Sequence, residues 1–266
     1  MVKPKTLSIL SFNILGMPLL SRKYAPRLKK IVEEIARIDP DVVCLQEVWL
    51  GATKKYLVRQ LAAVGFGHFY RPMAGRRLSG LLVLTKPKIF APQKYFFAPS
   101  VENFSLPLTE LLVASGYCWF ELSVGGQKMI IVDLHLSVDW QFNLASAQGL
   151  GLGRLAELSR LAKEIKNLGK RKIIVAGDFN LEKNSSVYRK FLQISGLDDP
   201  GRGSIFKTTL FNLYRWPMAK SGQQRDFIFT KNLDLSKIKV QLLWVQPFPQ
   251  IGCLSDHAGL LMALKL

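Results

Sequence analysis

The chain has few cysteines, and those it has are widely spaced. Cys44, Cys118 and Cys253 are its three cysteines among 266 residues. Their number is odd and no C-x-x-C pair is present, which argues against a disulfide framework and against the common cysteine-based zinc sites. Two of them lie in apolar, strand-like stretches, so we expect them to act as small buried hydrophobic residues. This usage favours a reducing compartment.

An uncharged run long enough to cross a membrane is also missing. The run from Thr6 to Ser21 follows Lys3 and Lys5 and superficially resembles a signal peptide, but it contains a polar asparagine and a proline. No small-x-small cleavage site follows it, and it is shorter than the roughly 20 residues that a membrane-spanning helix needs. We interpret it as a first core strand and expect a cytoplasmic protein with peripheral membrane contact as an option; export is the alternative.

Acidic residues are scarce relative to basic ones. The chain has 37 lysines and arginines against 19 aspartates and glutamates, a formal net charge of +18. Such an excess predicts attraction to polyanions, namely nucleic acid, anionic lipid head groups or phosphorylated small molecules. The charge alone does not choose among these partners, and a solvated basic surface without a specific partner is the alternative. Hydrophobic residues make up 48% of the chain, which is enough for a sizeable core and excludes a disordered chain.

What is present is an alternation of strand and helix patterns. Leu28, Ile31 and Ile35 recur at helical spacing, and "VGGQ" at 124–127 is typical of a hairpin. No linker rich in Pro, Gly and Ser divides the chain, so residues 1–266 are expected to form one α/β domain of two stacked mixed sheets flanked by helices. The expected strands are 6–14, 41–49, 80–86, 116–124, 128–136, 172–180, 226–231, 238–245 and 258–266, and the expected helices are 26–38, 53–63, 145–168 and 185–194.

Most of the expected strands have a carboxylate, an amide or an imidazole near one end. Each of these residues alone has an ordinary explanation as a turn residue, a surface acid or a satisfied core histidine. Together they predict an active site, because stacked sheets gather strand ends at one rim and buried polar groups are costly without partners. The residues are Asn13, Glu47, His135, Asp178, Asn180, Asp226, Asp256 and His257.

These residue types indicate a particular chemistry. Oxygen ligands without a cysteine cluster select Mg²⁺, with Mn²⁺ or Ca²⁺ as alternatives. A metal held by one or two carboxylates can bind a substrate phosphate, while histidines and an Asp/Asn pair orient water and stabilise charge. Together with the positive net charge, this set predicts metal-assisted hydrolysis of a phosphoester.

Several motifs carry a resemblance to a known family. In order they are "SFNILG" (11–16), "LQEVW" (45–49), "DLHLS" (133–137), "GDFN" (177–180), "RDFIF" (225–229) and "SDHAGL" (255–260). The set resembles the endonuclease/exonuclease/phosphatase superfamily over about residues 6–264. The resemblance implies a four-layer α-β-β-α sandwich with its catalytic rim at one edge of the paired sheets.

Within this superfamily the chain looks most like the neutral sphingomyelinases. The segment "NILGMPLLSRKYAPRLKKI" (13–31) is similar to theirs, and "LQEVW" and "GLLVLTKPKI" (80–89) favour the same group. One position departs from the pattern. Those enzymes usually carry a second histidine two residues after the one that matches His135, and this chain has Ser137 there, which makes the lipid substrate less secure.

The resemblance implies a role for each acidic and amide residue of the site. Glu47 is expected to be the principal Mg²⁺ ligand, assisted by Asn13 and, in some arrangements, Asp256. Asp178 is expected to orient or deprotonate the attacking water. Asn180 would hold that water and a phosphate oxygen.

The two histidines receive different expected roles. His257, oriented by Asp226, would act as a general base or, when protonated, as a donor to the phosphate. His135 would bind a non-bridging phosphate oxygen and stabilise the developing charge. The resemblance leaves open which group takes the proton.

Two substrate classes remain open at this point. A phospholipase C-type enzyme is favoured by the resemblance and by the aromatic-rich stretch 95–120, whose alternative explanation is ordinary core strands. A nuclease is favoured by the basic excess and by residues 200–225, which contain no acid and the basic residues Arg202, Lys207, Arg215, Lys220 and Arg225. An inositol-phosphate phosphatase and a catalytically silent binding module are further alternatives. We expect a monomer whose partner is its phosphodiester substrate.

Overall fold

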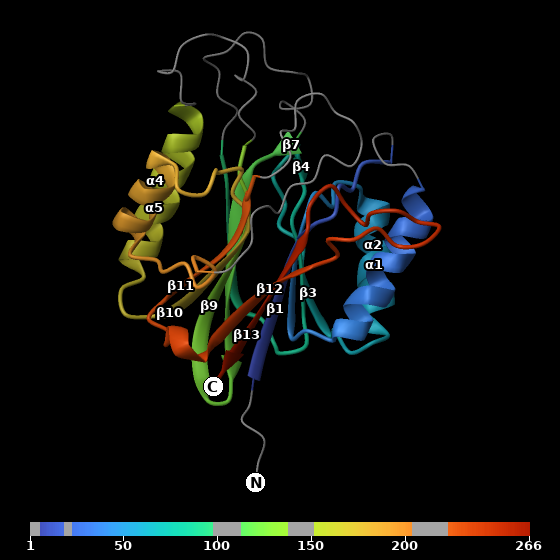
Figure 1. Cartoon of the computed structure of the whole chain (residues 1–266), viewed down its shortest axis with the longest axis horizontal. Helices are drawn as coiled ribbons and strands as arrows, with labels where there is room; N and C mark the ends of the chain where they lie inside the picture. Colours follow the sequence, from blue (N-terminus) through green and yellow to red (C-terminus); the bar gives the residue numbers. More distant parts are fainter. Residues whose placement is uncertain (1–5, 19–22, 98–112, 138–151, 204–222) are drawn as a thin grey trace.

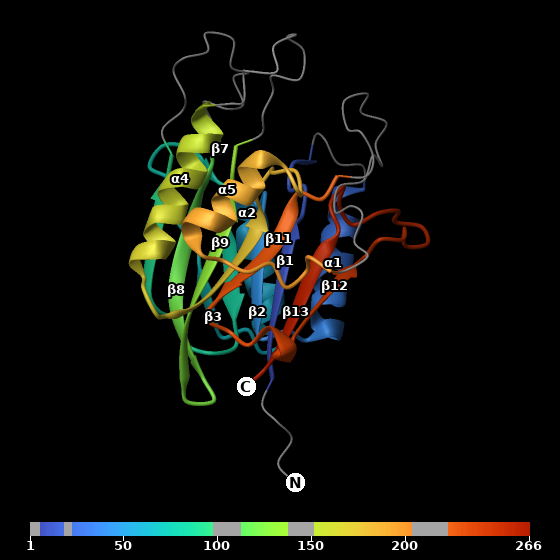
Figure 2. The ribbon, with the colours of Figure 1, turned by 60° about the vertical axis from the view of Figure 1, so that its left-hand side comes forward.

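The computed structural model describes residues 6–18, 23–97, 113–137, 152–203 and 223–266. Over these ranges the chain forms two stacked mixed β-sheets with helices on both outer faces, as Figures 1 and 2 show from two directions. The predicted α/β fold, two mixed sheets flanked by helices, is therefore confirmed.

The first sheet has the strand order β12-β13-β1-β2-β5-β3. Strands β1 and β2 are parallel, and the other neighbours are antiparallel. Its strands are β1 (Thr6–Asn13), β2 (Val42–Gln46), β3 (His68–Tyr70), β5 (Leu82–Thr85), β12 (Ile238–Leu243) and β13 (Gly259–Lys265).

The second sheet has the order β11-β10-β9-β8-β6, with β9 and β10 parallel and the other pairs antiparallel. Its strands are β6 (Phe90–Phe96), β8 (Gly116–Val124), β9 (Gln127–His135), β10 (Lys172–Asp178) and β11 (Asp226–Lys231). The expected hairpin joins β8 to β9 through Gly125 and Gly126, whose φ angles of 60° and 78° suit glycine. A separate pair consists of β4 (Leu78–Ser79) and β7 (Val113–Ala114).

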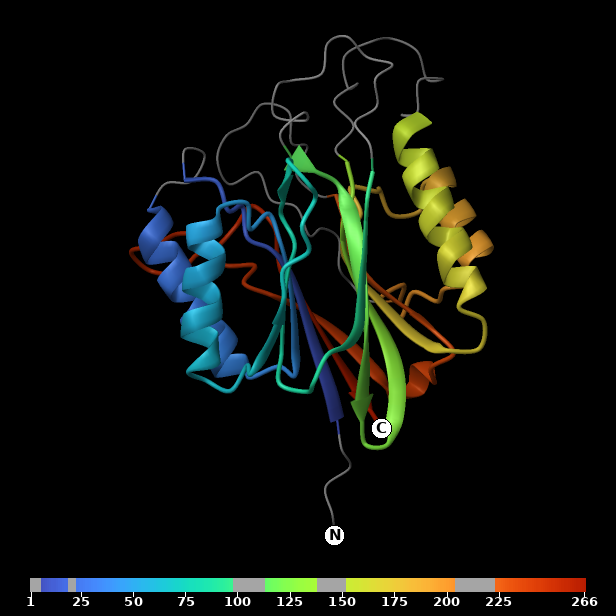
Figure 3. The same ribbon diagram turned by 180° about the vertical axis from the view of Figure 1, so that it is seen from behind.

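Helices cover the two outer faces in pairs, which Figure 3 shows from behind. Helices α1 (Tyr24–Ile38) and α2 (Gly51–Ala62) lie against the first sheet, and α4 (Leu152–Asn167) and α5 (Ser186–Ser195) against the second. Helix α5 begins where the Ser185 hydroxyl accepts a bond from the Tyr188 amide. A short 3₁₀ turn, Leu235–Lys237, precedes β12. The part of the predicted helix 145–168 before Leu152 lies outside the described residues.

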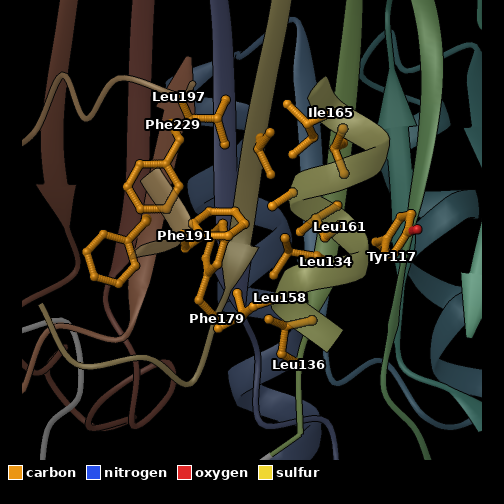
Figure 4. Packing of buried hydrophobic residues seen from close by; sticks show 14 of the residues in the cluster. Tyr117, Leu134, Leu136, Leu158, Leu161, Ile165, Phe179, Phe191, Leu197 and Phe229 are labelled. Atoms are coloured by element: carbon orange, nitrogen blue, oxygen red, sulfur yellow. The ribbon is translucent and has the colours of Figure 1, made fainter. Parts of the chain in front are cut away.

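Three apolar layers result from this stacking. One lies between α4/α5 and the second sheet, where Leu158 and Leu161 pack on Leu134 and Phe179 (Figure 4). A second lies between the sheets and contains Cys44 and Cys118, both fully buried as predicted. Cys253 was expected to be buried as well, but it is only half-buried. The third joins α1 and α2 to the first sheet. Among the described helices, none is long and apolar enough to cross a membrane.

Four short or irregular strands, β3, β4, β6 and β7, were not expected from the sequence. Strand β6 contains Pro92, and the first five of its seven residues are exposed, so it lacks the alternating pattern that marks a half-buried strand. Strands β3 and β6 are the last strands of their sheets. Edge position explains the weak pattern, because an edge strand has fewer neighbours to bury it.

Candidate active site

The strand directions bring the polar strand ends to one rim. Two parallel pairs end there. In the first sheet β1 ends at Asn13 and β2 ends just before Glu47. In the second sheet β9 ends at His135 and β10 ends at Asp178. Strands β11 and β13 run the opposite way and begin at this rim, so Asp226 lies opposite Asp178 in the ladder. In Figure 1 this rim is at the top, away from both marked termini.

Asn13 connects the acidic groups of the two sheets. Its Nδ2 donates to Glu47 Oε1 at 2.9 Å and to Asp178 Oδ2 at 3.0 Å, while its Oδ1 accepts from the Leu15 amide at 3.1 Å. The amide of Asn180 donates to the other oxygen of Asp178 at 2.9 Å. The buried carboxylate of Asp178 and the partly exposed carboxylate of Glu47 are thus held close together by amide donors.

His135 faces the same two carboxylates. Its Nε2 lies 3.9 Å from Glu47 Oε1 and 3.8 Å from Asp178 Oδ2. This nitrogen is buried and has no hydrogen-bond partner in the structure, although buried polar atoms are normally satisfied. The ring packs against Trp49 at a centroid distance of 5.7 Å. His135 therefore presents an unused polar atom to the space beside the carboxylates.

His257 and Asp226 form a hydrogen-bonded pair. His257 Nδ1 lies 2.9 Å from Asp226 Oδ2, and its Nε2 lies 3.7 Å from Asp178 Oδ2. A carboxylate on one ring nitrogen sets the tautomer and orientation of the imidazole, so the other nitrogen is available for proton transfer. The Ser255 hydroxyl accepts from the His257 amide and fixes the backbone of this loop.

The electrostatics of these groups follow from burial and from each other. Burial raises the pKa of Glu47, despite the opposing effect of His135. Burial would also raise the pKa of Asp178, but the two histidines hold it below its ordinary value. Burial would lower the pKa of His257, yet Asp226 and Asp178 hold it well above its ordinary value. The arrangement favours an ionised Asp178 beside a protonated His257.

The donor set fits a divalent cation. Among the described residues, Glu47 and Asp178 form no ion pair with lysine or arginine and share Asn13 as a donor; Asp178 is buried and Glu47 is partly exposed. Carboxylate and amide oxygens of this kind suit Mg²⁺. Asp178, Asp226 and His257 also present ligand atoms within 4.8 Å of one another. The 2.9 Å bond between Asp226 Oδ2 and His257 Nδ1 already occupies one ligand atom of each of these two residues.

Two sequence-predicted residues have partners that differ from the expected ones. The side-chain amide of Asn180 donates to the Leu136 carbonyl at 2.8 Å and accepts from Arg225 Nη1 at 3.2 Å, so much of its capacity is already used within the protein. Asp256 accepts from the Ser255 hydroxyl at 3.1 Å. It acts on the site electrostatically, since it raises the pKa values of both Glu47 and His257.

The backbone at this rim is unusual. Glu47 and Asn180 have positive φ angles of 58° and 47°, a conformation that costs energy in residues other than glycine. A Cβ at Gly16 would lie 2.0 Å from the Glu47 carbonyl oxygen. Only glycine at position 16 therefore allows the segment after Asn13 to approach the backbone of Glu47.

Arg27 and Trp49 support the site, although the sequence did not identify them. The buried Arg27 guanidinium on α1 donates to the carbonyls of Ile14, Leu15 and Leu254. It therefore ties the segment after Asn13 to the loop before His257. In the sequence Arg27 stands in a basic stretch of the kind that is usually exposed, so nothing there indicated that it is buried. The position of Trp49 in "LQEVW" was the only available hint for its contact with His135.

Ser137 has a structural partner that accounts for its place. Its hydroxyl donates to Glu157 Oε1 at 2.6 Å and lies 3.0 Å from the Ser115 hydroxyl, and its amide donates to Glu157 Oε2 at 3.1 Å. This network ties α4 to the ends of β8 and β9. Ser137 thus serves the attachment of a helix at the position where the resemblance leads one to expect a histidine.

The described ends of the aromatic stretch 95–120 belong to the core. Tyr95, Phe97 and Tyr117 form a contacting group with centroid separations of 5.0 to 6.0 Å under α4. Residues 98–112, which would form the tip of any lipid-facing hairpin, lie outside the described residues. So do Lys207, Arg215 and Lys220 of the basic segment.

Comparison with known proteins identifies related chains. A model of the endonuclease/exonuclease/phosphatase family matches residues 10–257. A Drosophila melanogaster protein named "Putative neutral sphingomyelinase" is 26% identical over 285 residues, which span 98% of this chain. The chain covers 61% of the length of that relative.

Solved structures resemble this fold at low sequence identity. Sphingomyelinase C from Streptomyces griseocarneus superposes with a TM-score of 0.72 at 19% identity, covering 98% of this chain and 99% of the other. TDP2 from D. rerio, solved with a single-strand DNA product, superposes with a TM-score of 0.74 at 19% identity and covers 98% and 100%. These likenesses show a shared fold.

Proposed function

The chain belongs to the endonuclease/exonuclease/phosphatase family, and from that premise we propose that it is a Mg²⁺-dependent phosphodiesterase that cleaves a phospholipid in the manner of a phospholipase C. The observation that supports this most is the gathering of Asn13, Glu47, His135 and Asp178 from two sheets around one buried acidic site. The likeness to the Drosophila protein supports a sphingomyelin-like substrate.

We propose that Glu47 and Asn13 hold the cation, with Asp256 contributing charge nearby. A bound divalent cation would supply positive charge that polarises the phosphoryl group. Glu47 suits this role because its carboxylate is only partly exposed, pairs with no lysine or arginine among the described residues and lies across Asn13 from Asp178.

In the proposed reaction Asp178 orients the attacking water and accepts its proton. The water oxygen forms the new bond to phosphorus as the bond from phosphorus to the lipid oxygen breaks. His257, kept protonated by Asp226 and Asp178, donates to the phosphate or to the departing oxygen. His135 Nε2, which has no hydrogen-bond partner among the described residues, binds a non-bridging phosphate oxygen and stabilises the developing charge.

A nuclease is the second candidate. The net charge of +18 favours a polyanionic substrate, and Arg225 lies within hydrogen-bond distance of Asn180 at the rim. The fold likeness to a protein solved with a DNA product is consistent with this candidate. The exposed apolar residues Met73 and Leu78 favour the lipid substrate.

A panel of substrates separates the two candidates. Purified protein with Mg²⁺ is offered sphingomyelin vesicles, phosphatidylcholine vesicles, supercoiled DNA, abasic-site duplex and RNA, each with an EDTA control. We expect EDTA-sensitive release of the phosphorylated head group from lipid, and none from the Asp178→Asn variant. Cleavage of nucleic acid without lipid hydrolysis would overturn the proposal in favour of the nuclease.

The single domain over residues 1–266, the monomeric state and the cytoplasmic or membrane-peripheral location stay predictions. Light scattering of the purified protein measures the mass in solution. A mass of twice the 30.0 kDa chain would contradict the monomer.

A further inference from the structure

One stretch of the chain combines two surface properties. Between Glu47 and Glu102 the sequence contains nine lysines and arginines and no acidic residue. Of the eight large hydrophobic side chains that are exposed among the described residues, six lie in this same stretch. Where exposed apolar and basic groups lie together in the structure, they are typical of a surface that binds a partner.

One part of this stretch, Phe69–Gly80, is here called the rim-edge segment. Strand β3 ends at Tyr70, and β5 begins at Leu82, which pairs with Leu45 of β2. The rim-edge segment therefore lies at the end of the sheet where Glu47 lies. Its strand β4 is at the top of the sandwich in Figure 1 and toward the viewer in Figure 3.

Contacts join the rim-edge segment directly to the site. The Val48 amide, next to Glu47, donates to the Gly80 carbonyl at 2.8 Å. Gly80 packs so closely on Trp49 that a Cβ there would lie 2.7 Å from the indole ring. Trp49 in turn packs on His135. A partner that binds the rim-edge segment would therefore lie beside the active site.

The backbone of the segment is anchored while its large side chains point outward. Lys94 Nζ donates to the Met73 carbonyl at 2.6 Å, and Lys54 donates to the Ser79 carbonyl. Met73 is 66% exposed, Phe69 46% and Leu78 42%.

Arginines stand among these apolar side chains. Arg71 and Arg76 are exposed, and the Arg71 guanidinium lies 5.3 Å from the centroid of the Phe69 ring. The segment therefore mixes outward apolar and cationic groups within twelve residues of chain, Phe69 to Gly80.

We propose that the rim-edge segment docks the protein on an anionic lipid bilayer and presents the active site to lipid head groups. Methionine, leucine and phenylalanine side chains enter the boundary between head groups and acyl chains, while arginines contact lipid phosphates. Nucleic acid would use the arginines but would leave Met73 and Leu78 exposed to water, so the apolar residues favour the bilayer. The proposal deepens the lipid-hydrolase function and rests on it for the substrate, whereas docking itself needs no turnover.

Vesicle binding by the catalytically disabled Asp178→Asn protein tests docking separately from hydrolysis. Phosphatidylcholine vesicles with and without phosphatidylserine are sedimented with the protein. A charge variant carries Arg71→Glu and Arg76→Glu, and an apolar variant carries Met73→Ser and Leu78→Ser. The matched control carries Leu235→Ser, Lys237→Glu and Lys239→Glu, which are exposed at the opposite edge of the same sheet.

We expect the charge variant to lose about tenfold or more of its affinity for anionic vesicles, since each basic residue near such a surface contributes about fivefold. The apolar variant should lose affinity for them as well, and the control should bind like the parent. Equal binding by the parent and both docking variants, or an equal loss in the control, would overturn the proposal. So would a loss of duplex DNA affinity in the charge variant with vesicle binding unchanged.

Turnover by the active protein gives a second readout. The docking substitutions are expected to lower hydrolysis of vesicle lipid while leaving turnover of a water-soluble phosphodiester, bis(p-nitrophenyl) phosphate, unchanged. A protein that hydrolyses no lipid yet binds anionic vesicles through the rim-edge segment would overturn the proposed function and keep the docking surface. Melting curves confirm that each variant is folded, and single substitutions replace any that is not.

Discussion

At the scale of single residues, Asp178 is the group on which most contacts of the site converge. It accepts from Asn13 and from the Asn180 amide, and it lies 3.7 Å from His257 and 3.8 Å from His135. These donors stabilise a buried carboxylate that would otherwise be costly. They also keep it ionised, which a proton acceptor requires.

Loss of either proton-transfer group should therefore slow the reaction with little change in fold. We expect Asp178→Asn and His257→Ala each to lower kcat by about 10²-fold or more. The control is Asp234→Asn, an exposed aspartate that caps a 3₁₀ turn. The test is to measure kcat on the substrate that the protein cleaves, with a melting curve for each variant. Near-normal turnover in a folded variant would contradict the role proposed for that residue.

A second buried acid lies below the site and carries a different prediction. Asp133 on β9 is fully buried between the sheets, and its Oδ1 accepts from Gln46 Nε2 at 2.6 Å. Its other oxygen has no hydrogen-bond partner in the described part of the chain. Burial raises the pKa of Asp133 well above its ordinary value, so the folded protein keeps this proton to a higher pH than the unfolded chain does.

This raised pKa makes stability depend on pH with a definite sign. Above about pH 4 the unfolded chain releases this proton while the folded protein keeps it, so the contribution to stability falls as pH rises, by at most about 1.4 kcal/mol per unit. Asp133→Asn keeps the acceptor for Gln46 and removes the titration. Denaturant unfolding from pH 4 to 7 should show the variant gaining stability relative to the parent. A stability difference between variant and parent that does not change with pH would contradict a raised pKa at Asp133. Glu33→Gln, on the exposed face of α1, is the control.

At the scale of elements, α1 acts as a clamp on two rim segments through Arg27. Its donors reach carbonyls that follow Asn13 and a carbonyl three residues before His257. Removal of the guanidinium leaves these buried carbonyls without a charged donor and frees both segments.

We expect Arg27→Met to lower the free energy of unfolding by about 2–4 kcal/mol, because several buried acceptors lose their partner. Turnover should fall too, and Arg27→Lys should restore part of both. Arg37→Met is the matched control, since Arg37 lies exposed on the same helix and pairs with Glu34; such a pair contributes about 0–1 kcal/mol. Equal effects at the two positions in unfolding and turnover would refute the clamp.

The central elements were predictable from sequence, and the edge elements were not. Strands such as β1, β9 and β10 are buried on both faces and read as continuous apolar runs. Strands β3 and β6 lie at the sheet edges with mostly exposed residues, so nothing in their own composition required a strand. Their pairing depends on the neighbours β5 and β8, which only the assembled sheets supply.

At the scale of the whole molecule, the site exists because two sheets stack with their polar ends at one rim. Asn13 and Glu47 come from the first sheet, and His135 and Asp178 come from the second. Two carboxylates held this close repel each other, and among the described residues no lysine or arginine pairs with either of them. A divalent ion that binds only the folded protein should relieve that repulsion and stabilise the whole molecule.

Mg²⁺ should therefore raise the melting temperature of the parent protein, by about 2–4 °C for each kcal/mol of binding free energy. Glu47→Gln keeps an acceptor for Asn13 but removes one charge. We expect this variant to melt higher than the parent in EDTA and to respond little to Mg²⁺. An equal Mg²⁺ response in both proteins, measured by calorimetry, would place the cation elsewhere.

The sequence by itself determined the alternation of elements, the apolar layers and the identities of the polar strand ends, because periodicity and residue chemistry are local properties. The tertiary structure alone decided which of those residues touch: that Asn13 spans Glu47 and Asp178, that Asp226 pairs with His257 and that Asn180 is partly occupied by Arg225. It alone also revealed Arg27 as buried and the rim-edge segment as a neighbour of Trp49. The reason is that these contacts join residues far apart in the chain, and their distances are set by how the two sheets and α1 pack together.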